Sequence, residues 1–305
     1  MTAVLRTEQL SRRYGHVWGL RDCTLELPEG SVTALIGANG AGKSTLLHLI
    51  VGLIAPTSGS VFLFGKRGMF TAPAQLAQLA RVGFVAQDHP LYSAFTVADL
   101  LRMGRGLNLR WDQAFAEQRL KRLAIPLDRR SRNLSGGQQA QVALTMALAK
   151  RPRLLVLDEP VASLDPLARR EFMKGLMEAV AGGGLTVLMS SHVVSELERV
   201  CDHVVLLRDG RVQLAGEIDA LLACHRLLVG PRGASHSNAV GSDVIRVEHS
   251  DQHTRLLVKG ITGATWHPRW NGHAVGFEEL VLAYLEEPRD QAVAGAASPR
   301  SGVGS

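Results

Sequence analysis

A glycine-rich segment that ends in lysine, serine and threonine is the clearest chemical signal in the sequence. Gly37 to Thr45 reads Gly-Ala-Asn-Gly-Ala-Gly-Lys-Ser-Thr and directly follows Ser31 to Ile36, a short apolar run typical of a buried strand. The spacing matches G-x-x-x-x-G-K-[ST], the P-loop, whose glycines let backbone N–H groups turn toward phosphate oxygens at the start of a helix. It predicts phosphate binding by Gly37, Ala38, Asn39, Gly40, Ala41, Gly42, Lys43, Ser44 and Thr45.

Two carboxylates that follow a second apolar run could complete this chemistry. Asp158 and Glu159 come directly after Leu154 to Leu157, so they stand at the carboxyl end of a predicted central strand, where open α/β sheets bind ligands. We expect Lys43 to reach the β- and γ-phosphates, and Ser44 and Asp158 to hold Mg²⁺. Glu159 is placed to act as general base toward an attacking water. The pattern predicts hydrolysis of a nucleoside triphosphate.

Two further polar residues stand at the ends of short apolar runs. His192 follows Met189-Ser190-Ser191, and Gln87 follows Val82 to Ala86. A lone histidine is more often structural than catalytic, but one at the edge beside the γ-phosphate could bind that phosphate and orient Glu159. Gln87 could contact the γ-phosphate and Mg²⁺ and relay their presence to the helices that follow it.

The order of apolar patterns indicates the elements that must position these side chains. Strands are expected within residues 4–36, a helix-rich insertion at about 88–150, and an α/β pattern from Pro152 onward. After about Arg226 the composition changes to short strands and one amphipathic helix, Phe277 to Glu287. We therefore predict a domain at 1–225, a small α+β extension at 226–287 and a disordered tail at 288–305.

The composition limits the class of protein. The chain has 305 residues, of which 46% are hydrophobic and 20% charged, so it can bury a large core. Its net charge of +6 suits phosphate ligands or an anionic membrane surface as well as nucleic acid, but 5% aromatic residues argue against stacking platforms for single strands. Neither a secretory signal nor a membrane-spanning run is recognised, and three scattered cysteines predict no metal site or disulfide framework.

Taken in order, these motifs resemble the nucleotide-binding subunit of ATP-binding cassette transporters over roughly residues 4–225. The resemblance implies an α/β fold of the P-loop NTPase type with a helical subdomain and an antiparallel β subdomain, and ATP and Mg²⁺ as cofactors. It assigns Tyr14 to adenine stacking and Gln87 to the loop that senses the nucleotide. It also assigns Asp165 to the loop that crosses a dimer interface. The residues that it matches to the family's signature sequence are Ser135, Gly136, Gly137 and Gln138.

This signature segment, by the resemblance, binds the γ-phosphate of ATP held by a second subunit. Ser135 with two glycines at the start of a helix would offer a hydroxyl, backbone N–H groups and the helix dipole to an anion. The helical insertion separates it from the P-loop of its own chain. We therefore predict a head-to-tail homodimer, or a pair with a similar cassette, that encloses two ATP molecules. After Gln138 the family usually has basic residues, whereas Gln139, Ala140 and Gln141 follow here, which puts a local charge network in doubt.

The resemblance further implies a partner and a place in the cell. A single cassette with a short C-terminal extension looks like the ATPase subunit of bacterial exporters, including drug-resistance types, which work with an integral membrane permease at the cytoplasmic face of the membrane. No nucleic acid partner is expected. Two alternatives stay open: a soluble cassette ATPase that acts on nucleic acid or ribosomes, and a nucleotide-binding regulatory subunit without turnover.

Overall fold

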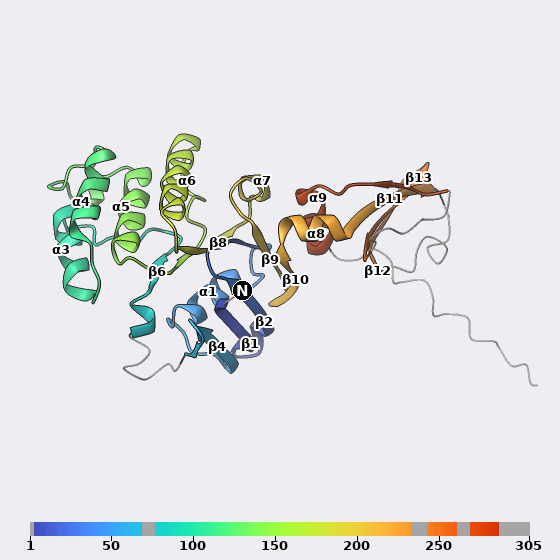
Figure 1. The fold of residues 1–305 in the computed structure, drawn as a ribbon, viewed down its shortest axis with the longest axis horizontal. Coiled ribbons are helices and arrows are strands. Elements are labelled where there is room, and N and C mark those ends of the chain that lie inside the picture. Colours follow the sequence, from blue (N-terminus) through green and yellow to red (C-terminus); the bar gives the residue numbers. More distant parts are fainter. Residues whose placement is uncertain (1–2, 69–76, 233–242, 261–268, 287–305) are drawn as a thin grey trace, which may run out of the picture. The chain divides into compact units, whose positions relative to one another are not determined.

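The computed structural model describes residues 3–68, 77–232, 243–260 and 269–286. The chain divides into two compact units, Met1–Ile218 and Asp219–Ser305 (Figure 1). The predicted disordered tail at 288–305 lies outside the described residues. Within the described part of the chain, no helix is long and apolar enough to cross a membrane.

A six-stranded sheet forms the centre of the first unit, with the order β10-β9-β3-β8-β7-β6. All neighbouring strands run parallel except β10, which is antiparallel to β9. Every residue of β3, β7 and β8 is buried, as expected of apolar strands covered on both faces. The strands are β3 (Val32–Ile36), β6 (Val82–Val85), β7 (Leu154–Leu157), β8 (Thr186–Ser191), β9 (His203–Arg208) and β10 (Arg211–Glu217).

A second sheet, antiparallel, stands beside helix α1 (Lys43–Ile50). Its order is β2-β1-β4-β5, and the two long strands form a hairpin that brings Tyr14 and Val17 together at its tip. Leucines from both sheets and from α1 share one apolar core, which fixes the P-loop helix against the two layers. The strands are β1 (Ala3–Tyr14), β2 (Val17–Pro28), β4 (Ser58–Leu63) and β5 (Lys66–Arg67).

The helical part of this unit has an apolar core of its own. Helices α3 (Val97–Leu107), α4 (Gln113–Arg122) and α5 (Gly136–Ala149) pack around Leu100, Leu120 and Val142, and Figure 1 shows them grouped together. A 3₁₀ turn, η1 (Ser131–Asn133), leads into α5, and α6 (Pro166–Ala181) packs against α5.

One predicted helix is shorter than the sequence pattern suggests. The apolar spacing of Val193 to Val200 predicts a helix, but α7 covers only Val194–Leu197, and turns follow it. The N–H of Glu198 donates to the carbonyl oxygen of Val194, and that of Cys201 to the carbonyl oxygen of Leu197, so single turns replace the last residues of the expected helix.

The second unit contains a four-stranded antiparallel sheet with the order β12-β13-β11-β14. Ion pairs of Arg246 with Glu286 and of Arg255 with Glu279 join its strands to α9, and the buried His225 contacts the Tyr284 hydroxyl at 2.9 Å. The predicted strands and helix of this region are present, while α8 and β14 were not predicted. The elements are α8 (Ile218–Cys224), β11 (His225–Pro231), β12 (Asp243–His249), β13 (His253–Lys259), β14 (Asn271–His273) and α9 (Phe277–Leu285).

Candidate active site

The P-loop turns sharply between β3 and α1. Gly42 caps α1 with φ 101°, and a Cβ at this position would lie 2.4 Å from the carbonyl oxygen of Gly19. Only glycine accepts both the left-handed backbone and the close approach. Lys43 is 5% exposed, and its Nζ donates to the carbonyl oxygens of Gly37 at 2.8 Å and Ala38 at 3.3 Å. The loop thus holds a buried ammonium beside backbone N–H groups at a helix start, which is an anion site.

Asp158 lies buried at the carboxyl end of β7, with 3% of its surface exposed. The Ser190 hydroxyl of the neighbouring strand β8 donates to Asp158 Oδ1 at 2.8 Å, and the same hydroxyl oxygen accepts from the backbone N–H of Glu159 at 2.8 Å. Ser190 therefore fixes both acidic residues. It was not predicted, and its only signal was a polar residue at the end of an apolar strand, two positions before His192.

Glu159 is held between two basic side chains. Its Oε1 lies 3.3 Å from Lys43 Nζ and its Oε2 lies 3.0 Å from His192 Nδ1. The Glu159 side chain is 11% exposed, whereas that of His192 is 51% exposed. The backbone of Glu159 has φ 42°, a left-handed conformation that a non-glycine residue adopts at an energetic cost and that occurs often at functional sites.

A cavity of about 540 Å³ brings the predicted residues of the P-loop, Gln87, Glu159 and His192 together. Parallel strands end at the same edge of a sheet, so residues from four distant parts of the sequence meet there. Gly19 and Ala162 also line the cavity, and neither was predicted. The residues around it are Gly19, Asn39, Gly40, Gly42, Lys43, Ser44, Thr45, Gln87, Glu159, Ala162 and His192.

The predicted magnesium donors are a hydroxyl from Ser44, an amide from Gln87 and a carboxylate from Asp158. Ser44 and Gln87 line the cavity, whereas Asp158 is not among its lining residues and is held by Ser190. Within the described residues, no group of three or more His, Cys, Asp or Glu could hold a metal. This donor set fits Mg²⁺, which uses oxygen ligands and needs one or two carboxylates alongside substrate phosphates and water.

Tyr14 stands against one wall of the cavity. Its ring is 46% exposed, and the Arg12 guanidinium lies 4.9 Å from the ring centroid. A Cβ at Gly19 would lie 2.8 Å from Tyr14 Cε2 and 3.2 Å from the Thr45 hydroxyl oxygen. The absence of a side chain at Gly19 therefore sets how closely the aromatic ring approaches the P-loop.

We expect Gly19→Ala to raise the KM for ATP about fivefold and to leave kcat unchanged. The added Cβ would displace the Tyr14 ring, to which the resemblance assigns adenine stacking, and such stacking on a base contributes about 1–3 kcal/mol to binding before and during the reaction alike. Steady-state kinetics check this result. In a Tyr14→Ala background the same substitution should add nothing, because the ring through which it acts is gone; a further rise in KM there would contradict the explanation.

The signature residues and Asp165 do not line this cavity. Ser135 caps α5 in a reciprocal arrangement, because its Oγ accepts from the N–H of Gln138 at 3.2 Å and Gln138 Oε1 accepts from the N–H of Ser135 at 3.1 Å. Asp165 caps α6 and accepts from the N–H groups of Leu167 and Ala168 at 3.0 Å. Ser135, Gly136 and Asp165 are exposed. Two exposed helix starts thus lie apart from the P-loop cavity.

A P-loop, a buried aspartate and an adjoining glutamate at the carboxyl edge of a parallel sheet define a nucleotide-hydrolysing P-loop domain. Residues 20–162 match the family model described as ABC transporter. The chain belongs to this ABC transporter family: it is an ATP-binding cassette that hydrolyses ATP with Mg²⁺.

The chain is similar to two curated proteins and to one solved structure. The chain is 37% identical to the Fe(3+) ions import ATP-binding protein FbpC of Mesorhizobium japonicum over 70% of this chain and 60% of that protein. It is 35% identical to the thiamine import ATP-binding protein ThiQ of Vibrio parahaemolyticus over 66% of this chain and 86% of that protein. The dimeric structure of a bacterial ABC transporter cassette matches with a TM-score of 0.63 and 25% identity, over 70% of this chain and 98% of that one.

Proposed function

We propose that this chain is the ATP-hydrolysing subunit of an ABC transporter and works as a dimer around two MgATP. The observation that carries the proposal is the separation of two anion sites: the cavity beside Lys43, and the exposed start of α5 at Ser135. Each site alone offers half of the contacts that an enclosed ATP needs, and a twofold dimer supplies the other half. The dimeric form of the related cassette supports this arrangement.

In this proposal the P-loop cavity binds the triphosphate. Lys43 leaves the loop carbonyls for the β- and γ-phosphates, and the ring of Tyr14 stacks on adenine. Ser44, Gln87 and Asp158 would hold Mg²⁺, which neutralises charge at the phosphate oxygens.

Glu159 is the proposed general base. Its carboxylate stands 3.3 Å from Lys43 Nζ, so arrival of a γ-phosphate at that ammonium gives Lys43 a second anionic partner and frees Glu159 for a water. Glu159 takes a proton from the water as the water oxygen attacks the γ-phosphorus, and the bond from the γ-phosphorus to the bridging oxygen breaks, so ADP leaves and inorganic phosphate forms. The Nδ1–H of His192 donates to Glu159 Oε2 at 3.0 Å and so orients the carboxylate toward the water.

The signature and Asp165 act on the ATP of the partner subunit in this proposal. The hydroxyl of Ser135, the N–H groups of Gly136 and Gly137 and the amide of Gln138 face the partner's γ-phosphate, and the start of α5 adds its dipole. Bound ATP then holds the dimer together, and loss of the γ-phosphate loosens it, which gives the two states of a transport cycle.

A separate integral membrane permease is the proposed partner. Both curated relatives carry names of import ATP-binding proteins. The alternative of an ATPase for nucleic acid or ribosomes has no support among these relatives.

The proposal also concerns the direction of transport and the location of the chain in the cell. Export, at the cytoplasmic face of the membrane, is the direction that the resemblance to exporter subunits predicts. The names of the two curated relatives support import instead. The permease determines whether substrate is exported or imported. The permease recovered with this chain should therefore be reconstituted in vesicles with ATP on one side of the membrane. Movement of substrate away from the side that holds ATP supports export.

The proposal is tested by two measurements, the release of phosphate from MgATP and the capture of a membrane partner. The purified chain should release phosphate from MgATP, and a chelator of divalent metal ions should stop this release, because the donor set near Asp158 needs Mg²⁺ to engage the phosphates. Capture from membranes with this chain as bait should recover an integral membrane protein. Phosphate release without any such protein, or recovery of ribosomes instead, would contradict the transport role. A chain that binds ATP without releasing phosphate would be a regulatory subunit.

A further inference from the structure

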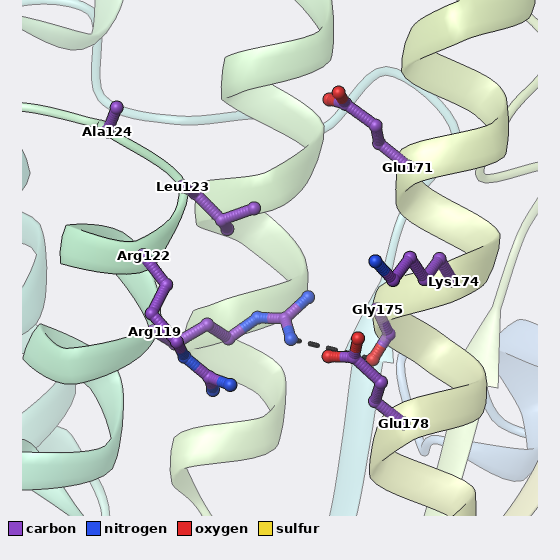
Figure 2. A pocket seen from close by; sticks show the side chains of 8 residues that line it. All are labelled: Arg119, Arg122, Leu123, Ala124, Glu171, Lys174, Gly175 and Glu178. Carbon is purple, nitrogen blue, oxygen red and sulfur yellow. Dashed lines mark hydrogen bonds between the residues drawn. The ribbon is translucent and has the colours of Figure 1, made fainter.

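A second cavity, of about 390 Å³, lies among the helices of the first unit (Figure 2). It is lined by residues of α4 and α6, and Figure 2 shows Arg119 reaching from α4 toward Gly175 and Glu178 of α6. Charged residues of both signs line it, and nothing in its chemistry selects one class of ligand. Among the residues that line this cavity, Arg119 is buried, with only 4% of its surface exposed.

Arg119 makes hydrogen bonds to three oxygens from two other helices. Its Nε donates to the Thr145 hydroxyl at 3.1 Å and its Nη2 donates to Gln141 Oε1 at 3.0 Å, both in α5. Its Nη1 donates to the backbone carbonyl of Gly175 in α6 at 3.5 Å, a long bond. One planar guanidinium therefore joins α4, α5 and α6, which the fork of an arginine can do and a single ammonium cannot.

Two close approaches involve α6, one to Arg119 of α4 and one to the start of α5. A Cβ at Gly175 would lie 2.4 Å from Arg119 Nη2, so a glycine in the middle of α6 makes room for the arginine. The starts of α5 and α6 also approach closely, because a Cβ at Gly137 would lie 2.7 Å from the Cβ of Ala168. Glycine costs a helix interior about 1 kcal/mol relative to alanine, so its presence at position 175 calls for a reason such as this one.

The helices that Arg119 joins carry the residues proposed to reach the partner subunit's ATP. Ser135 caps α5 and Gly136 begins it, about one and a half turns before Gln141, and Asp165 caps α6. We propose that Arg119 is a positioning residue for ATP hydrolysis, which fixes α5 to α6 so that both helix starts meet the partner's γ-phosphate together. This inference rests on the proposed function, because it needs a dimer in which these starts contact ATP.

The bonds of Arg119 are poorly suited to a purely stabilising role. Among the described residues no carboxylate forms an ion pair with it, and its acceptors are neutral oxygens. Burial lowers the pKa of the Arg119 guanidinium, and the nearby Glu178 carboxylate opposes that effect. A buried cation without a paired carboxylate is costly, and replacing such charges with apolar side chains of similar size is often neutral or stabilising. A positioning role explains why the charge stays.

The test begins with Arg119→Met in the full chain. We expect kcat for ATP hydrolysis to fall about tenfold, the KM for ATP to change less than about twofold, and the denaturant midpoint of unfolding to stay equal or rise. ATP-dependent dimerisation of a chain that also carries Glu159→Gln should weaken in parallel. Arg122→Met is the matched control, because Arg122 lines the same cavity from α4 but is exposed and makes no contact that the argument uses.

Gly175→Ala provides an independent way to break the contact between Arg119 and α6. The new Cβ should push the flexible end of Arg119 away from α6, so kcat should again fall about tenfold although alanine favours the helix. In the Arg119→Met background, Gly175→Ala should cost nothing more, since both changes remove one link. This double-mutant cycle separates an effect through Arg119 from a general defect of α6, even if one single variant folds poorly.

The outcomes are distinct. If the native chain releases phosphate and Arg119→Met does so equally, the inference about Arg119 is wrong while the proposed function stands. If Gly175→Ala lowers kcat as much with methionine at position 119 as with arginine, the link is also wrong. A native chain that releases no phosphate would contradict the proposed function itself and with it this role. The fold-changes above, with an unchanged Arg122→Met, support the positioning role.

Discussion

Replacing Glu159 with glutamine is expected to reduce phosphate release by about 10²–10³-fold and to leave the chain as an ATP-bound dimer. The amide keeps the shape of the side chain and its place near Lys43 and His192, which stand 3.3 Å and 3.0 Å from its oxygens, but it cannot accept a proton from water. It also removes a negative charge that would face the γ-phosphate, so ATP should bind at least as well. Phosphate release and size-exclusion chromatography with saturating MgATP measure the two effects.

Controls for this experiment separate the base from general damage. Glu26→Gln changes an exposed glutamate of β2 and should leave turnover and the oligomeric state as they are. The dimer formed by the Glu159→Gln chain should dissociate when ATP is replaced by ADP, because the γ-phosphate carries the bridging contacts. A Glu159→Gln chain that stays monomeric at saturating ATP would refute the enclosed dimer for this protein, and one that keeps its turnover would refute the base.

The cavity residues could be predicted because their positions follow from one rule of sheet geometry. Apolar runs ended before Gly37, Gln87, Asp158 and His192, and parallel strands place their carboxyl ends at one edge. The apolar residues from Ser44 to Val51 likewise predict a buried helix after the P-loop, and α1 spans Lys43–Ile50. In each case a few adjacent residues carry both the pattern and the position, so no knowledge of distant contacts was needed.

Residues whose roles depend on contacts between distant segments of the chain could not be predicted from a local sequence pattern. Ser190 was not predicted because its bonds to Asp158 and to the N–H of Glu159 join neighbouring strands that lie far apart in the sequence. Gly19 was not predicted because the sequence does not say that a Cβ there would meet Tyr14 and the wall of the P-loop. Both depend on tertiary geometry that local pattern does not encode.

Short polar elements were missed for a different reason. β4 begins Ser58-Gly59-Ser60 and β5 has two charged residues, so neither shows the apolar alternation that predicts a strand. They form because pairing with β1 satisfies the backbone of β4, and β5 in turn pairs with β4. Pairing with neighbouring strands thus overrides local sequence preference in both β4 and β5.

The neutral residues after the signature have a structural role in place of a charge network. Gln139 Nε2 donates to the carbonyl oxygens of Ser131 at 3.3 Å and Leu134 at 3.1 Å, which fastens η1 to the start of α5. Gln141 accepts from Arg119. In place of the basic residues usual in the family, Gln139 thus makes hydrogen bonds to backbone carbonyls and Gln141 accepts a hydrogen bond from one buried guanidinium.

Replacing Ser135 with arginine is expected to spare ATP binding and to lower hydrolysis by about 10²-fold or more. The substitution removes the hydroxyl that caps α5 and fills the exposed helix start with a long side chain, so in the proposed dimer the partner's γ-phosphate would lose its donors there. Loss of the cap itself costs about 1 kcal/mol and leaves the Lys43 cavity intact. Binding of a fluorescent ATP analogue and phosphate release distinguish the two properties.

The chain offers a matched control for the lost cap. Thr96 caps α3 with the same reciprocal arrangement, in which Asp99 takes the place of Gln138. Thr96→Arg should therefore lower stability by a similar amount and leave the hydrolysis of the isolated chain unchanged. Equal loss of hydrolysis in both variants would mean that the effect of Ser135→Arg comes from a weakened helical part and not from a missing phosphate contact.

Mixing two inactive variants decides whether the signature serves the partner subunit. Ser135→Arg keeps an intact P-loop and Lys43→Ala keeps an intact signature, so a mixed dimer contains one complete site. In an equal mixture about half of the dimers are mixed, so about a quarter of all sites are complete and measurable hydrolysis should return. If each chain instead used its own signature, no combination of the two would contain a complete site, and the mixture would stay as inactive as its components.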